Sequence, residues 1–352
     1  VENNLAGAND FRATGGPITV SQVPLENPLD RAFLKAGEQA GHPVNPDTNG
    51  ADQLGVGRFD TNIAGGRRIS TARGYLRTAL ARPNLEVLTG SLCRRLIMEE
   101  GRVAGAELQQ GRRRITRHAQ REVILCAGAI GSPQILMLSG IGASADLEAL
   151  DIPVVHDLPG VGSNLQDHLE IHLHYRAPGN AALNREMLPH RLLPALARWA
   201  VNGTGPAASN GCAVGAFLPT SENVAHPDVQ IHFFPVYLKG WIPKPWPSGF
   251  RIGIGTLRAQ SRGSIRLQSN DPTIPPLIDP QYLTVDQDLA DLRRCVELAR
   301  EIAAQPAFDG LRGEEMDPGS HVQSTAEIDE FIRNTAETAY HVSCSCRMGS
   351  DS

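Results

Sequence analysis

A glycine-rich string at residues 128–142 is the part of the sequence best suited to holding a ligand. It follows a short apolar run at 123–127, which predicts a strand buried on both faces of a parallel sheet. Ligands of open α/β sheets gather at the carboxyl ends of the strands, and glycines such as Gly128 let the backbone approach them. Ser132 and Pro133 then predict a helix start, through a hydroxyl cap and a preset backbone φ. We expect a nucleotide here, with an ordinary glycine-rich turn as the alternative.

A second glycine pattern imitates a nicotinamide site. Gly140, Gly142 and Ala145 match the form G-x-G-x-x-A. The helix after this pattern would have to end before Pro153, which is too short for the crossover of a dinucleotide-binding unit. A nicotinamide-dependent dehydrogenase is therefore a minor alternative.

Histidines and cysteines are the next candidates for chemistry. His168, His172 and His174 are close in sequence, but no further ligand cluster accompanies them, so we expect structural roles and no metal. Six cysteines occur without a C-x-x-C pair or a dense disulfide spacing, which indicates a reducing compartment. Cys344 and Cys346 are expected to be small buried residues.

Several strings resemble one family along essentially the whole chain. The string at 128–142 is similar to the second signature of the glucose-methanol-choline oxidoreductases. Other similar strings follow in the family's order, at residues 45–50, 70–73, 82–85, 158–168, 261–263 and 340–349. The match departs at Val342, where the family often has proline. The family's N-terminal phosphate loop and its C-terminal segment, which supplies a second active-site residue, are not found in this sequence.

The resemblance implies FAD as the cofactor and oxidation of an alcohol to an aldehyde, with a hydride passing to flavin N5. His341 matches the family's catalytic histidine, which handles the hydroxyl proton, and imidazole suits that task because it titrates near neutral pH. Cys93 matches a position where the family contacts the flavin adenine through the backbone. Ala127, Gly128 and Pro133 match the cofactor-binding signature.

Glu170 is the residue through which the resemblance bears on the substrate. Family members that use choline carry a glutamate two residues after the residue that matches His168. A carboxylate there can neutralise a quaternary ammonium, helped by aromatic faces. The sequence does not choose these faces among Trp199, Trp241, Trp246 and nearby phenylalanines or tyrosines. Choline is slightly favoured over other primary alcohols. A polar start to a strand is the other interpretation of Glu170.

The elements that position these residues are expected to be of two kinds. Short apolar runs at 85–88, 92–98 and 103–108 predict a strand meander. An antiparallel sheet backed by helices is predicted from strands at 169–175, 229–234, 250–257 and 264–267 and helices at 194–201 and 286–304. Two further helices are predicted, one opened by Asn27 and Pro28 and one at 72–80.

These elements predict a fold of class α/β plus α+β. An incomplete FAD-binding, Rossmann-like domain is expected to accompany a substrate domain of antiparallel sheet backed by helices. The expected divisions are lead-in, cap and substrate-domain elements at 1–64, part of the FAD domain at 65–165, the substrate domain at 166–335, and the segment with the catalytic histidine at 336–352.

Composition bounds the partners. With 352 residues, 41% of them hydrophobic, the chain is globular and large enough for two domains. The basic residues are not interleaved with aromatics, which excludes a nucleic-acid surface. The uncharged stretch at 123–145 is broken by glycines and a proline, so no transmembrane segment is expected.

We therefore expect a cytoplasmic enzyme that acts on a small-molecule alcohol, with peripheral membrane association left open. The sequence does not choose oxygen, a quinone or another carrier as electron acceptor. The competing interpretation is a cofactor-free, non-catalytic fragment or binding module, because the loop that would cradle the pyrophosphate is not found.

Overall fold

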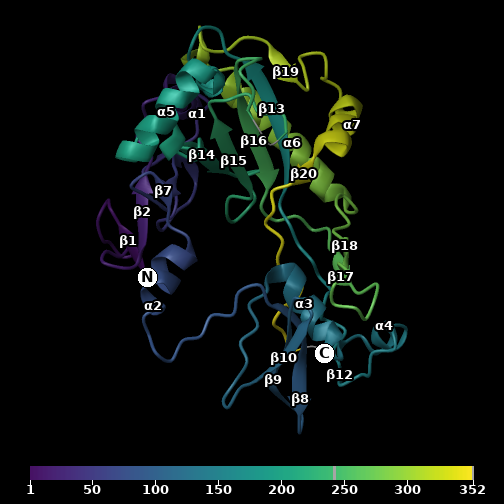
Figure 1. Ribbon diagram of the computed structural model, residues 1–352. Helices are drawn as coiled ribbons and strands as arrows, with labels where there is room; N and C mark the ends of the chain where they lie inside the picture. The colour runs from purple at the N-terminus through teal and green to yellow at the C-terminus, as the bar shows by residue number, and fades with distance from the viewer. Residues whose placement is uncertain (241–242, 351–352) are drawn as a thin grey trace. The chain divides into compact units, whose positions relative to one another are not determined.

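The protein is described by a computed structural model that covers residues 1–240 and 243–350 (Figure 1). The chain divides into two compact units, and each unit draws on three separate stretches of sequence. Unit 1 comprises Val1–Leu85, Glu170–Arg258 and Leu289–Glu337. Unit 2 comprises Glu86–Leu169, Ala259–Asp288 and the chain from Thr338 onward.

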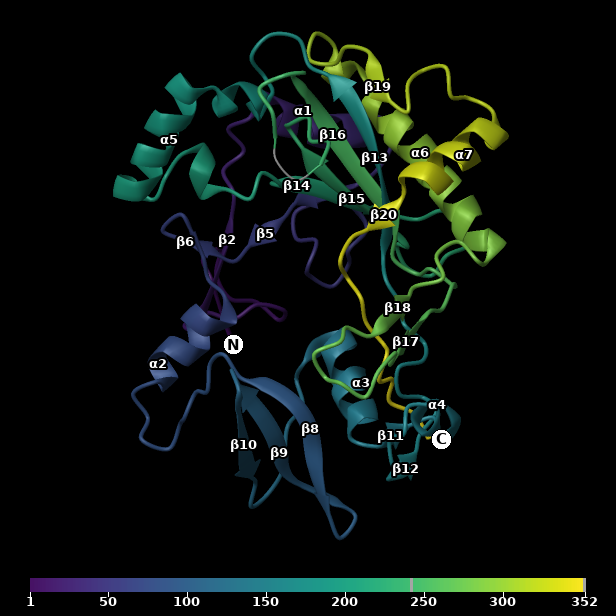
Figure 2. The same cartoon turned by 45° about the vertical axis from the view of Figure 1, so that its right-hand side comes forward.

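Unit 1 is built on an eight-stranded sheet (Figure 2). Its order is β19 (Glu315–Asp317), β13 (Leu169–Arg176), β16 (Gly249–Thr256), β15 (Val229–Phe234), β14 (Val214–Leu218), β4 (Gly55–Arg58) and β3 (Val44–Asn45), and β20 (Glu337–Thr338) pairs with β13. The pairs from β19 to β4 are antiparallel, whereas β3 and β4 are parallel. The sheet confirms the strands expected at 169–175, 229–234 and 250–257.

One face of this sheet forms the core of unit 1. Side chains alternate along a strand, so Ile171 and Leu173 on β13 are fully buried with Ile231 on β15. Helix α1 (Pro28–Gln39) packs on β4, β14 and β15, and its Phe33 stacks on a strand phenylalanine, Phe233, with ring centroids 4.7 Å apart. Burying each such side chain contributes roughly 1.5–3 kcal/mol.

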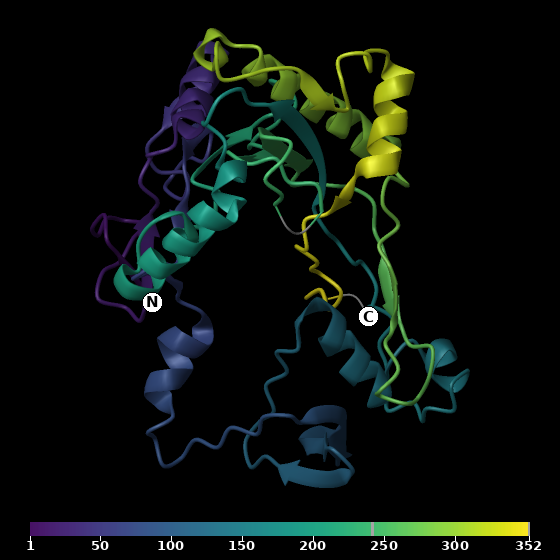
Figure 3. The ribbon, with the colours of Figure 1, turned by 45° about the horizontal axis from the view of Figure 1, so that its top comes forward.

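The helices of unit 1 follow local signals in the sequence. Asn27 caps α1 by accepting a hydrogen bond from Leu29, as the sequence predicted. The helix expected at 72–80 is formed by a π-helical turn, η1 (Ala72–Leu76), followed by α2 (Arg77–Ala79). The others are η2 (Leu183–Met187), α5 (Pro189–Asn202), η3 (Pro206–Ala208), α6 (Asp286–Ala303, whose first turn belongs to unit 2), η4 (Pro306–Phe308) and α7 (Thr325–Thr335). Figure 3 shows α6 and α7 as neighbours.

Unit 1 also contains small sheets, made by β1 (Glu2–Asn4), β2 (Ile18–Gln22) and β5 (Asp60–Thr61), and by β6 (Ile63–Ala64) and β7 (Arg67–Arg68).

Unit 2 combines a three-stranded antiparallel sheet with short helices. The sheet is formed by β8 (Leu92–Glu99), β9 (Arg102–Gln110) and β10 (Arg113–His118). Helix α3 (Gly128–Leu138) packs against β8, and Ser139 at its end accepts a hydrogen bond from the backbone of Leu96 at 2.8 Å. The remaining elements are β11 (Ile141–Gly142), α4 (Ser144–Glu148), β12 (His156–Asp157), β17 (Ser264–Arg266) and β18 (Leu277–Asp279). A separate core contains Met137, Leu147, Ile152, Val161, Leu165 and Ile265.

Five element predictions need correction. The strand expected at 264–267 is β17 in unit 2, which pairs with β18 and not with the eight-stranded sheet. The run at 123–127 forms no strand, and Ile124 is 75% exposed, because this stretch has no ladder partner among the described residues. The run at 85–88 is also not a strand, and the meander instead gains β10. Helix α3 begins at Gly128 rather than after Ser132, whose hydroxyl accepts a hydrogen bond from the backbone of Ala127. Helix α5 begins at Pro189, five residues earlier than expected.

Candidate active site

The segment that carries His341 is held within unit 2 by a backbone pairing. Gln166 and Ser343 exchange two backbone hydrogen bonds, of 3.0 and 2.8 Å. Tyr340 and Cys344, on either side of the histidine, have left-handed backbones with φ of 61° and 66°. Such conformations disfavour side-chain-bearing residues, so the surrounding structure must hold the segment in place. The exposed ring of His341 is thereby presented from a defined backbone.

His341 and His168 form a hydrogen-bonded pair. Their Nδ1 atoms are 3.1 Å apart, and their rings meet edge-on with centroids 5.2 Å apart. One ring must donate its Nδ1 proton to the other, which fixes complementary tautomers. When His341 donates, its Nε2 carries a lone pair and can accept a proton. The structure thus gives His168, which the sequence interpretation left as structural, a direct contact with the candidate base.

Asp167 organises the residues around this pair. Its buried carboxylate accepts hydrogen bonds from the backbone N–H of His341 at 2.9 Å and from the hydroxyls of Tyr282 and Thr338. Burial, together with the hydrogen bond to Asp167, raises the pKa of Tyr282 to about 12, so its hydroxyl stays protonated and keeps donating. Sequence reasoning missed Asp167, although its place next to His168 in the string 158–168 was the available signal.

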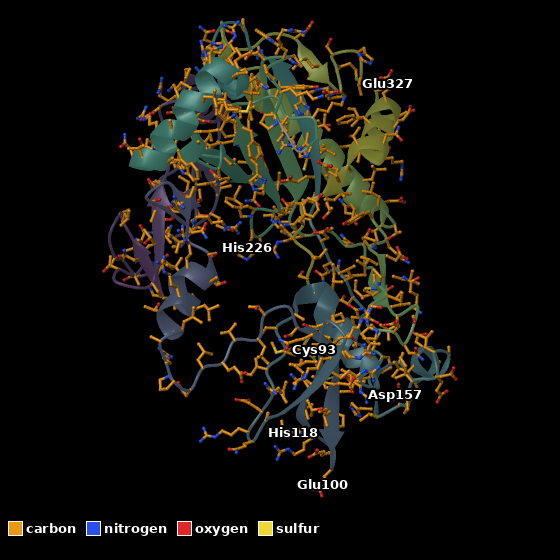
Figure 4. All side chains as sticks on the ribbon, viewed as in Figure 1. Cys93, Glu100, His118, Asp157, His226 and Glu327 are labelled. Carbon is orange, nitrogen blue, oxygen red and sulfur yellow. The ribbon has the colours of Figure 1, made fainter. Side chains whose placement is uncertain are left out.

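The residues expected to contact the cofactor lie on β8 and at the start of α3. Ala127 and Gly128 are exposed at the N-terminus of α3, where no side chain caps the helix. Gly128 has a φ of 76° and open space where a Cβ would lie, so a ligand can come close to the backbone. Pro133 is buried inside α3. Cys93 lies on β8 (Figure 4), and burial raises the pKa of its thiol.

Glu170 lies in unit 1, on the polar face of the eight-stranded sheet. Its Oε1 is 2.6 Å from Nδ1 of His232 on β15, and the two side chains are only 15% and 22% exposed. Burial alone would raise the pKa of Glu170. The hydrogen bond to His232 and the positive charges of His232, His172 and Arg251 outweigh burial, and the pKa is lowered. Glu170 is therefore an ionised carboxylate with a partner of its own.

Two of the three tryptophans have other partners. Trp199 donates to the carbonyl of Gly66, Trp246 is stacked under Arg185, and Trp241 lies outside the described residues. The rings next to the partner of Glu170 are phenylalanines. Phe59 and Phe234 lie with ring centroids 5.9 and 6.5 Å from that of His232. Phenylalanines were among the aromatic residues that the sequence left open.

The other histidines and the cysteines have the following environments. His172 contacts Glu337 at 2.8 Å, and Nε2 of His174 is 3.0 Å from the carbonyl oxygen of Leu238. Within the described residues, no group of three histidine, cysteine or acidic side chains could hold a metal. All six cysteines are free, but Cys344 and Cys346 are exposed, so the expectation that they are buried was wrong. They follow an irregular segment rather than a packed strand or helix, which leaves their side chains without cover.

Two family models match the chain, one before and one after the stretch 171–258. Residues 4–170 match the N-terminal model and residues 259–352 the C-terminal model of the GMC oxidoreductases. The chain belongs to the GMC oxidoreductase family. The first model includes the exposed start of α3 and His168, and the second includes His341.

Relatives of this GMC oxidoreductase include choline dehydrogenases. The chain is 44% identical to mitochondrial choline dehydrogenase of Mus musculus over 98% of the chain and 58% of that protein. It is 43% identical to oxygen-dependent choline dehydrogenase of Acinetobacter baumannii (strain AYE) over 99% of the chain and 64% of that protein. The chain therefore spans about three fifths of the length of these relatives.

Solved structures agree with the family assignment and confirm the fold class. Pyridoxine 4-oxidase from Mesorbium loti is 30% identical, with a TM-score of 0.85 over the whole chain and 65% of that structure. Formate oxidase is 21% identical, with a TM-score of 0.86 over 97% of the chain and 66% of that structure, and shows the same fold. No helix in the described part of this GMC oxidoreductase is long and apolar enough to cross a membrane.

Proposed function

We propose that this chain is part of a FAD-dependent enzyme that oxidises a primary alcohol to its aldehyde, with His341 handling the hydroxyl proton. The observation that carries the proposal is the pair of His341 and His168, fixed by Asp167, in a member of a family of alcohol oxidoreductases. A histidine on the surface without a role would not need a buried carboxylate and a second imidazole to fix its orientation.

The chemistry requires the hydroxyl proton and the hydride to leave the substrate by different routes. Flavin, when bound, supplies the acceptor for the hydride. Nε2 of His341 takes the hydroxyl proton, which builds alkoxide character on the substrate oxygen and favours release of the hydride from the carbon. His168 holds the required tautomer of His341, and Asp167 holds its backbone. The positive charge that forms on His341 is shared with the imidazole at 3.1 Å.

The residues proposed to hold FAD fit a nucleotide in their chemistry. Gly128 offers open space beside its backbone at the start of α3, which suits polar ligand atoms, while the amide of Ala127 donates to the hydroxyl of Ser132. Cys93 would contact the adenine through its backbone. Pro133 is proposed to act from within α3, by fixing the backbone of the turn.

The proposed substrate is choline or a related alcohol, for which Glu170 supplies an ionised carboxylate. The names of the relatives support choline. The electron acceptor is oxygen, a quinone or another carrier, and the proposed location is the cytoplasm, with peripheral membrane association as the alternative.

The test is a visible absorption spectrum of the full-length protein, mixed anaerobically with choline and, separately, with a neutral primary alcohol. Flavin bands that bleach with either alcohol support the proposed reaction, and the alcohol that bleaches at lower concentration identifies the substrate type. Absence of flavin bands would contradict the proposal and favour a non-catalytic role.

A further inference from the structure

Helix α5 of unit 1 leaves an apolar face uncovered. None of its fourteen residues is buried, although most of them are apolar. Leu193 is 66% exposed, Leu196 40% and Val201 82%. Together with the exposed Ala197 and Ala200, these residues are spaced at i, i+3, i+4, i+7 and i+8, so they lie along one side of the helix. These five residues are called the α5 stripe below.

The opposite side of α5 holds the helix on unit 1. Leu192, Ala195 and Trp199 are half-buried, and the indole of Trp199 donates a hydrogen bond to the carbonyl oxygen of Gly66 at 2.7 Å. Gly203 follows the helix in a left-handed conformation and packs against Gly66 on the β6–β7 hairpin. Because α5 is attached by this side, the α5 stripe faces outward from unit 1.

Basic residues border the α5 stripe, and α5 itself contains no acidic residue. Arg198 on α5 is exposed. Arg67 on the β6–β7 hairpin stacks on the tryptophan that anchors the helix, and the neighbouring Arg68 is exposed. The acidic residue shortly before the helix, Glu186, is paired with Arg191 at 3.1 Å. The border of the stripe is therefore positively charged.

An apolar stripe with a basic border is the pattern of helices that lie in the surface of a membrane. Their apolar side chains enter the boundary between headgroups and acyl chains, while their cations contact anionic headgroups. The fourteen residues of α5 are fewer than the about 20 that span the hydrocarbon core, so the helix would lie in the membrane plane. A second copy of the chain on this face would bring the same arginines together across a two-fold axis, where like charges repel.

We propose that α5 is the surface by which this protein docks on a membrane that contains anionic lipids. The α5 stripe enters the membrane surface, and Arg198, Arg67 and Arg68 contact the headgroups. Docking does not depend on the proposed alcohol oxidation, and it gives the peripheral membrane association named above a defined surface.

Co-flotation of the full-length protein with lipid vesicles tests the docking surface. The vesicles contain phosphatidylcholine alone, or phosphatidylcholine with about a third of phosphatidylglycerol. The wild type should float with the anionic vesicles and much less with the neutral ones. Leu193→Glu should weaken binding on the order of 10-fold or more, because a carboxylate would have to enter the membrane surface. Leu5→Glu, at a residue of unit 1 that is 65% exposed, is the matched control and should change binding less than about twofold.

A charge variant tests the basic border separately. Arg198→Gln should weaken binding to the anionic vesicles about fivefold and leave binding to the neutral vesicles unchanged. Arg333→Gln, at an exposed arginine of α7, is its control. Turnover of a soluble alcohol should stay the same in all four variants, since none of these residues belongs to the candidate active site. Loss of docking can therefore be told apart from failure of the proposed oxidation.

Three outcomes would overturn the proposed docking surface. The first is a wild type that floats with neither kind of vesicle, and the second is an equal effect of Leu193→Glu and Leu5→Glu. The third is a protein that binds no vesicle and that Leu193→Glu converts from a dimer to a monomer in size-exclusion chromatography. That result would assign the α5 stripe to contact with a second copy of the chain.

Discussion

At the scale of single residues, the candidate site depends on groups that fix other groups. His341 would be a mobile, exposed imidazole if it were not for His168 at its Nδ1 and Asp167 at its backbone N–H. Asp167 in turn is kept in place by two hydroxyl donors. A residue that transfers a proton needs a fixed position, because the rate of proton transfer depends on distance and tautomer as well as on pKa.

Replacing His341 with alanine should lower turnover on the order of 100-fold or more, because the hydroxyl proton then has no positioned acceptor. The flavin spectrum of the resting protein should stay unchanged. Steady-state kinetics and absorption spectra of the full-length protein check both points. His226→Ala is the control, since that histidine is exposed on a loop of unit 1 (Figure 4). Near-normal turnover in His341→Ala would remove the residue from the mechanism.

Replacing Asp167 with asparagine should lower kcat about 10- to 100-fold with little change in KM. An amide presents N–H donors where the carboxylate accepted from Tyr282, Thr338 and His341, so His341 loses its fixed backbone. Kinetics over a range of pH separate this effect from unfolding, with Asp146→Asn, an exposed aspartate of unit 2, as the control. A change in KM alone would show that Asp167 acts on substrate binding instead.

At the scale of elements, α1 combines a good cap with a poorly placed charge. Asn27 and Pro28 begin the helix, and Leu29, Phe33 and Ala36 bury its apolar side. Asp30 lies in the first turn, where the helix dipole favours a negative charge, yet it is only 5% exposed and one of its oxygens has no partner among the described residues. Burial outweighs the nearby charge of Arg31 and raises the pKa of Asp30 to about 7.

This raised pKa makes the stability of the folded protein depend on pH through Asp30. Between its unperturbed pKa of 3.8 and about 7, the unfolded chain loses a proton that the folded chain keeps, so stability falls as pH rises through this window. The free energy of unfolding of Asp30→Asn, relative to that of the wild type, should therefore increase by ~1.4 kcal/mol for each unit by which the pH rises within the window. Urea unfolding at about pH 4 and about pH 8 measures the difference. Equal differences at both pH values would show that Asp30 is ionised in the folded protein.

At the scale of the whole molecule, the two units have separate cores and separate candidate groups. Unit 1 has an aromatic core in which Phe308 stacks on Phe250 with ring centroids 5.1 Å apart, beneath the sheet that carries Glu170. Unit 2 has an aliphatic core beside the segment of His341. Since the chain passes between the units several times, each core is assembled from residues far apart in sequence.

Phe308→Ala should lower the free energy of unfolding by about 3–5 kcal/mol, because the fully buried ring leaves a cavity. Hydrogen exchange should speed up in β15 and β16 of unit 1 and stay slow in β8 and β9 of unit 2. Phe11→Ala is the control, since that ring is 57% exposed. Equal loss of protection in both units would show that they unfold as one.

Much of the local structure could be predicted from the sequence, because the signals are themselves local. The alternation at 229–234 and 250–257 is a property of neighbouring residues, and so is the Asn27 cap of α1. The prediction of a strand at 123–127 was wrong because a strand needs a neighbouring strand to accept and donate its backbone hydrogen bonds, and the described residues provide none.

The sequence by itself determined the family and the candidate base, since both rest on motifs of consecutive residues. Only the tertiary structure decided that His168 meets His341 across 173 positions of sequence and that Asp167 holds both sides of that contact. It also decided that Glu170 already has a hydrogen-bond partner in His232. A residue type and its spacing state which groups are present, but the path of the chain determines which charges and protons they exchange.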